Sequence, residues 1–233
     1  MTGNINSIET LGLLDGPGVR FVVFMQGCPL RCLFCHNPET WDNEPHLSMT
    51  PSELITRITK YHSYFGEDGG VTFSGGEPLN QPEFLLEALK LCKQFGFHTC
   101  LDTAGVGRGN YEEILKYTDL VLYDIKALNA EDYQDMTGQK IDESLLFLNL
   151  CQKLNKKMWL RQVIVPGIND NKDYILKLKD FIKPLKNIEK IELLAYHTLG
   201  NSKYDKLNLP YRLKDTKAMD KKTLDELSKL LMD

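Results

Sequence analysis

The chain has 233 residues and a formal net charge of −4, with 42% hydrophobic and 26% charged residues. This composition is typical of a globular protein and excludes a disordered or fibrous chain. The slightly acidic charge disfavours a general nucleic-acid binder, and no apolar run approaches the ~20 residues needed to cross a bilayer.

Six short apolar segments are rich in β-branched residues, as is typical of strands that are buried on both faces. They cover residues 20–25, 70–74, 98–102, 120–124, 159–165 and 188–194. Between them, Thr50-Pro51-Ser52-Glu53 is a capping box with proline at the first helical position, so we expect a helix to begin there. Pro82 begins a second amphipathic pattern, which Gly96 ends. Further helices are predicted at 111–117, 143–155, 171–182 and 216–232.

Alternating strands and helices predict an α/β fold with a parallel sheet. We find no internal repeat or linker, so a single domain over residues 1–233 is expected. Polar or reactive residues follow all six strands at their carboxyl ends, which is the arrangement at the mouth of a β/α barrel. An open doubly wound sheet would concentrate its site at one switch point instead. The sequence therefore favours a partial (β/α)6 barrel of the TIM type.

Three of the six cysteines, Cys28, Cys32 and Cys35, lie within eight residues directly after the first predicted strand. The N-terminus lacks the features of a signal peptide, so we expect a cytoplasmic protein with reduced thiols. Closely spaced thiols then indicate metal binding or redox chemistry rather than disulfides. The other three have apolar neighbours and are predicted to be packing residues: Cys92, Cys100 and Cys151.

The spacing C-x3-C-x2-C has two chemical interpretations. A [4Fe–4S] cluster that only transfers electrons is normally closed by four thiolates, so three would leave one iron open to a substrate or cofactor. The alternative is a zinc-stabilised binding module in which His36 completes a Cys₃His site. Zinc ligands usually come as two separated pairs, and adjacent Cys35 and His36 would be strained as joint ligands. The spacing favours the cluster.

The cysteine motif resembles the signature of radical S-adenosylmethionine (SAM) enzymes. Over nearly the whole chain, further segments resemble the group of glycyl-radical activases that act on pyruvate formate-lyase. These segments cover residues 15–20, 35–41, 74–78, 101–103, 124–126, 165–167 and 194–197. Many other activases carry a cysteine-rich insertion after the motif, whereas residues 36–74 here contain no cysteine. An activase of another glycyl-radical enzyme is the alternative within the family.

The resemblance implies that Cys28, Cys32 and Cys35 hold a [4Fe–4S] cluster whose fourth iron binds SAM. Reductive cleavage of SAM would give a 5′-deoxyadenosyl radical that removes hydrogen from a backbone glycine of pyruvate formate-lyase. The family also implies flavodoxin or ferredoxin as electron donor. A monomer is the expected state, because the enzyme must admit a large protein partner. Neither nucleic acid nor membrane is an expected partner.

The resemblance also assigns residues that contact SAM, namely Phe34, Cys35, His36, Gly75, Gly76, Glu77, Asp124, Ile125, Lys126, Arg161 and His197. Arg161 lies inside an apolar strand and needs an anionic partner, either the SAM carboxylate or an internal Asp or Glu. His197 is either a SAM contact or a core histidine.

Two further assignments follow from the resemblance. Asp102, Thr103 and Asp124 match a monovalent-cation site, although an ordinary ion pair between Asp102 and Lys126 is the simpler interpretation. Asp15 matches the catalytic segment that lies near the glycine of the protein substrate and orients it.

Overall fold

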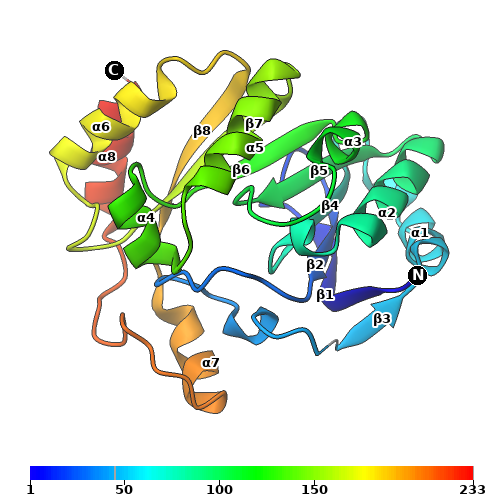
Figure 1. Ribbon diagram of the computed structural model, residues 1–233, viewed down its shortest axis with the longest axis horizontal. Coiled ribbons are helices and arrows are strands. Elements are labelled where there is room, and N and C mark those ends of the chain that lie inside the picture. Colours follow the sequence, from blue (N-terminus) through cyan, green and yellow to red (C-terminus); the bar gives the residue numbers. More distant parts are fainter. Residues whose placement is uncertain (45, 233) are drawn as a thin grey trace.

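The computed structural model describes residues 1–44 and 46–232, and it contains one eight-stranded sheet (Figure 1). The strands are β1 (Gly3–Gly12), β2 (Arg20–Met25), β3 (Leu47–Met49), β4 (Gly70–Gly75), β5 (His98–Thr103), β6 (Leu120–Ile125), β7 (Lys157–Ile164) and β8 (Ile188–Ala195). Their order across the sheet is β3-β1-β2-β4-β5-β6-β7-β8.

The strands β2, β4, β5, β6, β7 and β8 are the six that the sequence predicts, and each is parallel to its neighbour in this series. Helices connect them and cover the outer face of the curved sheet (Figure 1). The predicted α/β fold with a partial barrel is therefore confirmed. Because the strands are parallel, their carboxyl ends lie at one rim, where the polar residues that follow each strand meet.

Strands β1 and β3 were not predicted, and both pair antiparallel to their neighbours. Asn4, Asn6 and Gly3 are poor strand formers, so the local pattern of β1 is weak. Pairing with β2 stabilises β1 in spite of this composition, since Ile5 lies opposite Met25 and is fully buried. Tertiary pairing thus overrides local propensity at this edge of the sheet.

The α-helices are α1 (Pro51–Thr59), α2 (Pro82–Gln94), α3 (Tyr111–Lys116), α4 (Ala130–Thr137), α5 (Asp142–Lys153), α6 (Lys172–Ile182), α7 (Asn201–Lys206) and α8 (Lys221–Met232). Short 3-10 helices cover Pro38–Thr40, His62–Tyr64, Pro78–Asn80 and Thr198–Gly200. The predicted capping box is present, with Thr50 and Glu53 bonded to each other's backbone N–H. The helix predicted from 216 begins at Lys221 instead, where the Asp220 carboxylate accepts the Thr223 N–H at 2.8 Å.

Two hydrophobic clusters lie on opposite faces of the sheet, because side chains alternate along a strand. The main cluster joins strand residues such as Val121 and Leu160 to the helices. A small second cluster, with Cys100, Leu122 and Trp159, lines the inner face. All three cysteines predicted to pack are buried, with Cys92 and Cys151 in the main cluster.

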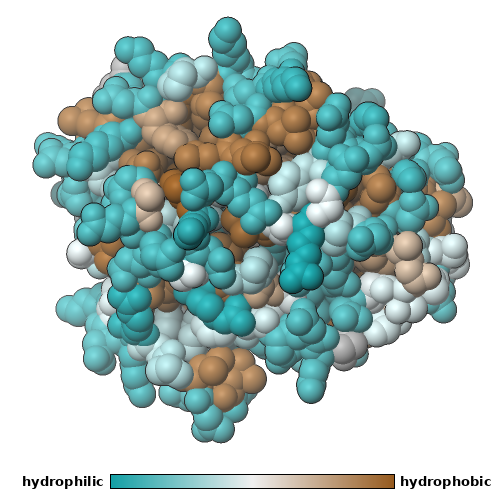
Figure 2. Space-filling model, viewed as in Figure 1, coloured by the Kyte–Doolittle hydropathy of each residue, from teal (hydrophilic) through white to brown (hydrophobic). Residues whose placement is uncertain are grey.

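The strand β8 forms one edge of the sheet, and most of its residues are only half-buried. Figure 2 shows the same face of the molecule, which is largely hydrophilic, with hydrophobic side chains gathered in the upper half around β8. Within residues 1–44 and 46–232, no helix is both long and apolar enough to span a bilayer.

Candidate active site

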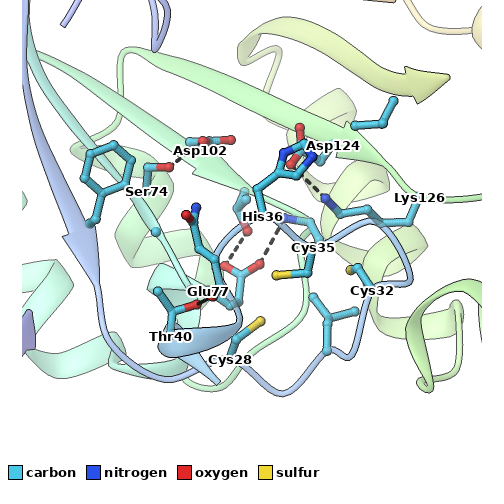
Figure 3. A pocket seen from close by; sticks show the side chains of 18 of the residues that line it. Cys28, Cys32, Cys35, His36, Thr40, Ser74, Glu77, Asp102, Asp124 and Lys126 are labelled. Atoms are coloured by element: carbon cyan, nitrogen blue, oxygen red, sulfur yellow. Dashed lines mark hydrogen bonds and ion pairs between the residues drawn. The ribbon is translucent and has the colours of Figure 1, made fainter. Parts of the chain in front are cut away.

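The segment from 26 to 37 carries the three clustered cysteines across the rim of the partial barrel. Figure 3 shows the sulfur atoms of Cys28, Cys32 and Cys35 turned toward the same space. All six cysteines of the chain are free thiols. Burial raises the pKa of the Cys32 thiol to about 12, so binding of a metal centre must displace its proton.

Contacts with the protein fix the shape of this cysteine loop. The backbone N–H groups of Arg31 and Leu33 donate to carbonyls at the end of α4, at 2.7 and 2.9 Å. The Arg31 guanidinium donates to the carbonyls of Cys28 and Leu30, both at 2.8 Å, and lies 5.0 Å from the centre of the Trp41 ring. The thiols are therefore held near one another by the fold itself.

A cavity of about 260 Å³ lies between the cysteine loop and the carboxyl ends of the strands. Fourteen of the sixteen predicted site residues line it, namely Asp15, Cys28, Cys32, Phe34, Cys35, His36, Gly75, Gly76, Glu77, Asp102, Thr103, Asp124, Lys126 and Arg161. The lining also includes residues that were not predicted, namely Phe24, Leu30, Thr40, Ser74, Ala104 and Val163. One signal could have identified Ser74: it directly precedes the predicted residues Gly75 and Gly76 at the end of β4.

The other two predicted residues, Ile125 and His197, do not line the cavity. Ile125 is buried in the main core cluster, so only its backbone can face a ligand. His197 follows β8 and stacks on His36, with ring centroids 3.6 Å apart. Its Nδ1 atom is buried and has no hydrogen-bond partner among the described residues.

His36 is fixed as a neutral ring. Its Nε2 atom lies 3.0 Å from the His197 carbonyl oxygen and must donate to it. Burial, together with the neighbouring His197, lowers the pKa of His36 to about 4. The Tyr204 hydroxyl donates to the Cys35 carbonyl at 3.0 Å, and the Lys203 ammonium donates to the Asn37 side chain at 2.8 Å. The segment after β8 thus closes over the end of the cysteine loop.

Four charged side chains form a network on the inner face. Arg161 donates from Nε to Asp124 at 3.1 Å and also pairs with Asp102. Lys126 pairs with Asp124 at 2.9 Å rather than with Asp102, and the Ser74 hydroxyl donates to Asp102 at 2.6 Å. Two internal carboxylates therefore meet the need of Arg161 for an anionic partner.

The positions of the two carboxylates set opposite pKa shifts. Burial raises the pKa of Asp102. Asp124 is partly buried, which alone would raise its pKa, but Lys126 and Arg161 outweigh that effect and lower it. Burial, with a contribution from the negative charge of Asp102, raises the pKa of Asp15 to about 6. Asp15 therefore changes charge much closer to neutral pH than an ordinary aspartate.

Glycine is required where β4 ends. Gly75 has φ = +104°, and a Cβ atom there would lie 2.3 Å from the Met25 nitrogen. A Cβ at Gly76 would lie 2.4 Å from the Gly27 oxygen. The close approach of these two backbones leaves main-chain groups, rather than side chains, facing the cavity.

Glu77 is almost fully buried and its carboxylate bonds to the protein. It accepts hydrogen bonds from the Thr103 hydroxyl at 2.6 Å, from the Leu79 N–H at 3.1 Å and from the Ala104 N–H at 2.9 Å. Burial raises the pKa of Glu77 to about 8. The side chain fixes the end of β5, and it turns the Thr103 hydroxyl toward itself.

The donor set fits a cluster and an organic ligand better than a single ion. Among the residues that the structure describes, no three His, Cys, Asp or Glu side chains lie close enough to hold one metal ion, so the alternative Cys₃His zinc site is not formed. An iron–sulfur cluster binds each thiolate at a different iron and therefore accepts sulfurs that stand further apart. The cavity next to them, lined by charged and polar side chains, has room for a polar ligand.

Comparison with known proteins agrees with this chemistry. The model of the radical SAM superfamily matches residues 22–181, more than half of the chain. The chain therefore belongs to the radical SAM superfamily.

Sequence relatives narrow the assignment. The chain is 53% identical over 230 residues to the pyruvate formate-lyase-activating enzyme of Clostridium pasteurianum, covering 98% of this chain and 97% of the relative. It is 41% identical over 235 residues to that of Staphylococcus epidermidis, covering 97% and 94%. Within the superfamily, the chain belongs to the pyruvate formate-lyase-activating enzymes.

Solved structures show the same architecture. A domain of the pyruvate formate-lyase-activating enzyme from Bacteroides vulgatus aligns with a TM-score of 0.56 and 25% identity, covering 71% of this chain and 94% of that one. Streptococcus suis SuiB, bound to the precursor peptide SuiA, aligns with a TM-score of 0.69 and 18% identity, covering 95% and 46%. The likeness to SuiB is one of fold.

Proposed function

We propose that this protein activates pyruvate formate-lyase by removing a hydrogen atom from a backbone glycine of that enzyme. Cys28, Cys32 and Cys35 would hold a [4Fe–4S] cluster, next to which SAM would bind. When bound, these two groups supply the electron and the carbon-centred radical that the reaction needs. The observation that carries the proposal is the set of three free thiols turned toward one cavity at the rim of the barrel.

We infer that the lining of the cavity binds SAM by its different chemical parts. The aromatic rings of Phe34 and His36 line the cavity and provide flat surfaces for the adenine. His197 stacks on His36 outside the lining and would act by holding that ring in place. The backbone at Gly75 and Gly76 suits the methionine end, because glycine lets a ligand approach the main chain. Ile125 and Glu77 would contribute through their main chain, since their side chains pack within the protein.

The charged network would orient the ligand. Lys126 and Arg161 are already balanced by Asp102 and Asp124. A carboxylate of the ligand would therefore add to a neutral group of charges rather than meet a bare cation. A pre-paired network needs little rearrangement on binding, which favours a single orientation of the ligand.

We propose three further features of this protein: a cation site, a role for Asp15 and a single-domain organisation. A monovalent cation would bind beside Asp102, Thr103 and Asp124, on the oxygen atoms that hard cations prefer. Asp15, at the cavity wall, would orient the glycine-bearing segment of the partner. Residues 1–233 would act as one domain, which the single sheet supports.

We also propose the setting of the reaction. A flavodoxin or ferredoxin would supply the electron, and the protein would act as a monomer in the cytoplasm. The closely spaced cysteines of the motif suit a reducing compartment, because in an oxidising one such cysteines tend to form disulfides.

Electron paramagnetic resonance tests the function directly. The protein is reconstituted anaerobically with iron and sulfide and mixed with SAM, a reductant and pyruvate formate-lyase. We expect a glycyl-radical signal that requires all four components. SAM cleavage without that signal, together with a radical on another glycyl-radical enzyme, would move the activity to a different partner.

A further inference from the structure

A fully buried arginine lies beneath the site, at the start of β2. Arg20 is 0% exposed, and its guanidinium donates hydrogen bonds to uncharged groups. Its Nη2 atom donates to the Val71 carbonyl at 2.5 Å, and its Nη1 atom lies 3.2 Å from Nδ1 of His98. Burying a positive charge with no carboxylate beside it costs free energy, which hydrogen bonds can offset. We therefore ask what these hydrogen bonds of Arg20 hold in place.

One of these hydrogen bonds leads to the cavity. The Nε atom of Arg20 donates to the Thr72 hydroxyl at 3.0 Å, and that hydroxyl donates in turn to the Asp15 carbonyl at 2.6 Å. Arg20 also reaches the Pro17 carbonyl at 3.4 Å. The guanidinium therefore holds both ends of the turn that contains Asp15.

The same turn fits tightly against the inner face of the sheet. Gly16 has φ = +129°, and a Cβ there would lie 3.1 Å from the Cys100 sulfur and 3.3 Å from Nε of Arg20. Just before the turn, Leu13 and Leu14 are 70% and 85% exposed. The turn thus places a carboxylate at the cavity and two apolar side chains outside it.

We propose that Arg20, through Thr72, is a positioning residue for the protein substrate. It fixes the turn at residues 15–18, so that Asp15 faces the cavity while Leu13 and Leu14 stay presented to the glycine-bearing segment. The inference rests on the proposed function, because it concerns how the partner's segment is received. It does not involve the cysteine loop, which Arg20 does not contact.

The substitution Thr72→Val tests this link, because it keeps the shape of the side chain and removes the hydroxyl. Thr99→Val is a matched control: Thr99 is also fully buried in a parallel strand, and its hydroxyl bonds to the Tyr117 carbonyl at 2.7 Å, away from the cavity. The probe is a synthetic peptide spanning the radical glycine of pyruvate formate-lyase. The readouts are the KM for this peptide, the rate of SAM cleavage without peptide, and the melting temperature.

We expect T72V to raise the KM for the peptide about tenfold, equivalent to about 1.4 kcal/mol, with peptide-free SAM cleavage within about twofold of the wild type. T99V should lower the melting temperature similarly and leave the KM unchanged. T72S, which keeps the hydroxyl, should restore the KM. If T72V does not fold, Arg20→Met is the second variant. It should likewise raise the KM for the peptide and leave peptide-free SAM cleavage nearly unchanged.

An unchanged KM in folded T72V or R20M, or an equal rise in T99V, would overturn the proposal and leave the network a structural one. Failure of the proposed function looks different. In that case the wild-type protein cleaves SAM but forms no glycyl radical on pyruvate formate-lyase or on the peptide.

Discussion

The imidazole rings of His36 and His197 stack face to face, with their planes inclined by only 13°, although 161 positions separate them in the chain. One ring belongs to the cysteine loop and the other follows the last strand. Their contact fixes the loop relative to the far edge of the sheet. It also shields one face of the His36 ring from water, and this shielding has a measurable consequence.

Stability should fall in acid because of His36. Its pKa is lowered from 6.5 to about 4 in the folded protein, so the unfolded chain binds its proton first. This contribution is complete above pH 6.5 and is lost as the pH falls from 6.5 toward 4. His36→Phe keeps a flat ring and removes the titration, so its free energy of unfolding should fall less over that range. Urea unfolding at several pH values measures the difference, and His46→Phe, at an exposed histidine, is the control. If the free energy of unfolding of H36F fell as much as that of the wild type over this pH range, the assignment to His36 would be wrong.

Removing Arg161 should destabilise the fold strongly. Arg161 is itself buried, and Arg161→Met leaves the partly buried Asp102 and Asp124 with only Lys126 as a neighbouring cation, which should lower the free energy of unfolding by about 3 kcal/mol at neutral pH. Arg212→Met breaks an exposed ion pair with Asp135 and should cost no more than about 1 kcal/mol. The deficit of R161M should shrink at lower pH, where the freed carboxylates take up protons. Chemical denaturation of both variants checks this, and equal losses would contradict a buried network.

The six cysteines should divide into two groups on mutation. Cys32→Ala should abolish cluster binding, because its thiol faces the cavity with those of Cys28 and Cys35. Cys92→Ala should leave the cluster intact, since Cys92 packs in the main core. Iron and acid-labile sulfide after anaerobic reconstitution give the answer. A C92A protein that is folded but lacks iron would show that the ligand set is wrong.

The two glycines Gly75 and Gly96 both have positive φ but differ in their surroundings. A Cβ at Gly96 meets nothing within 4 Å, so Gly96→Ala should cost only the left-handed conformation, about 1–2 kcal/mol. At Gly75 the Cβ would also collide with the backbone of β2, and Gly75→Ala should cost on the order of 3 kcal/mol or more. Melting temperatures rank the two variants, and SAM binding by calorimetry should be weakened in G75A alone.

The six parallel strands of the sheet could be predicted from the sequence, whereas strand β1 and helix α4 could not. The six parallel strands are continuous apolar runs, and their polar ends lead directly to one rim. The polar strand β1 is formed by pairing with β2, which local composition does not encode. The helix α4 was missed although Asn129 caps it and Gly138, with φ = 72°, ends it; its polar surface weakened the apolar pattern.

For the site, sequence position indicated which side chains meet but not how they pair. Arg161 lies opposite Asp124 in the register of β6 and β7, whereas Asp102 lies one strand further away. That register brings Arg161 to Asp124, whereas Lys126 pairs with Asp124 because it lies only two residues further along the chain. The hydroxyl of Thr103 likewise turns toward Glu77 because of a loop that follows a different strand.

The closure of the cysteine loop by Tyr204 bears on when the metal centre can be inserted. Tyr204 is made 169 residues after Cys35, to whose carbonyl it bonds. At a synthesis rate of 5–20 residues per second, this interval is roughly 10 to 30 s. During that time the nascent chain presents its thiols without the cover that the later segment provides. A cluster delivered on the ribosome would therefore meet a cysteine loop that Tyr204 does not yet hold, whereas in the finished protein this hydrogen bond already fixes the end of the loop.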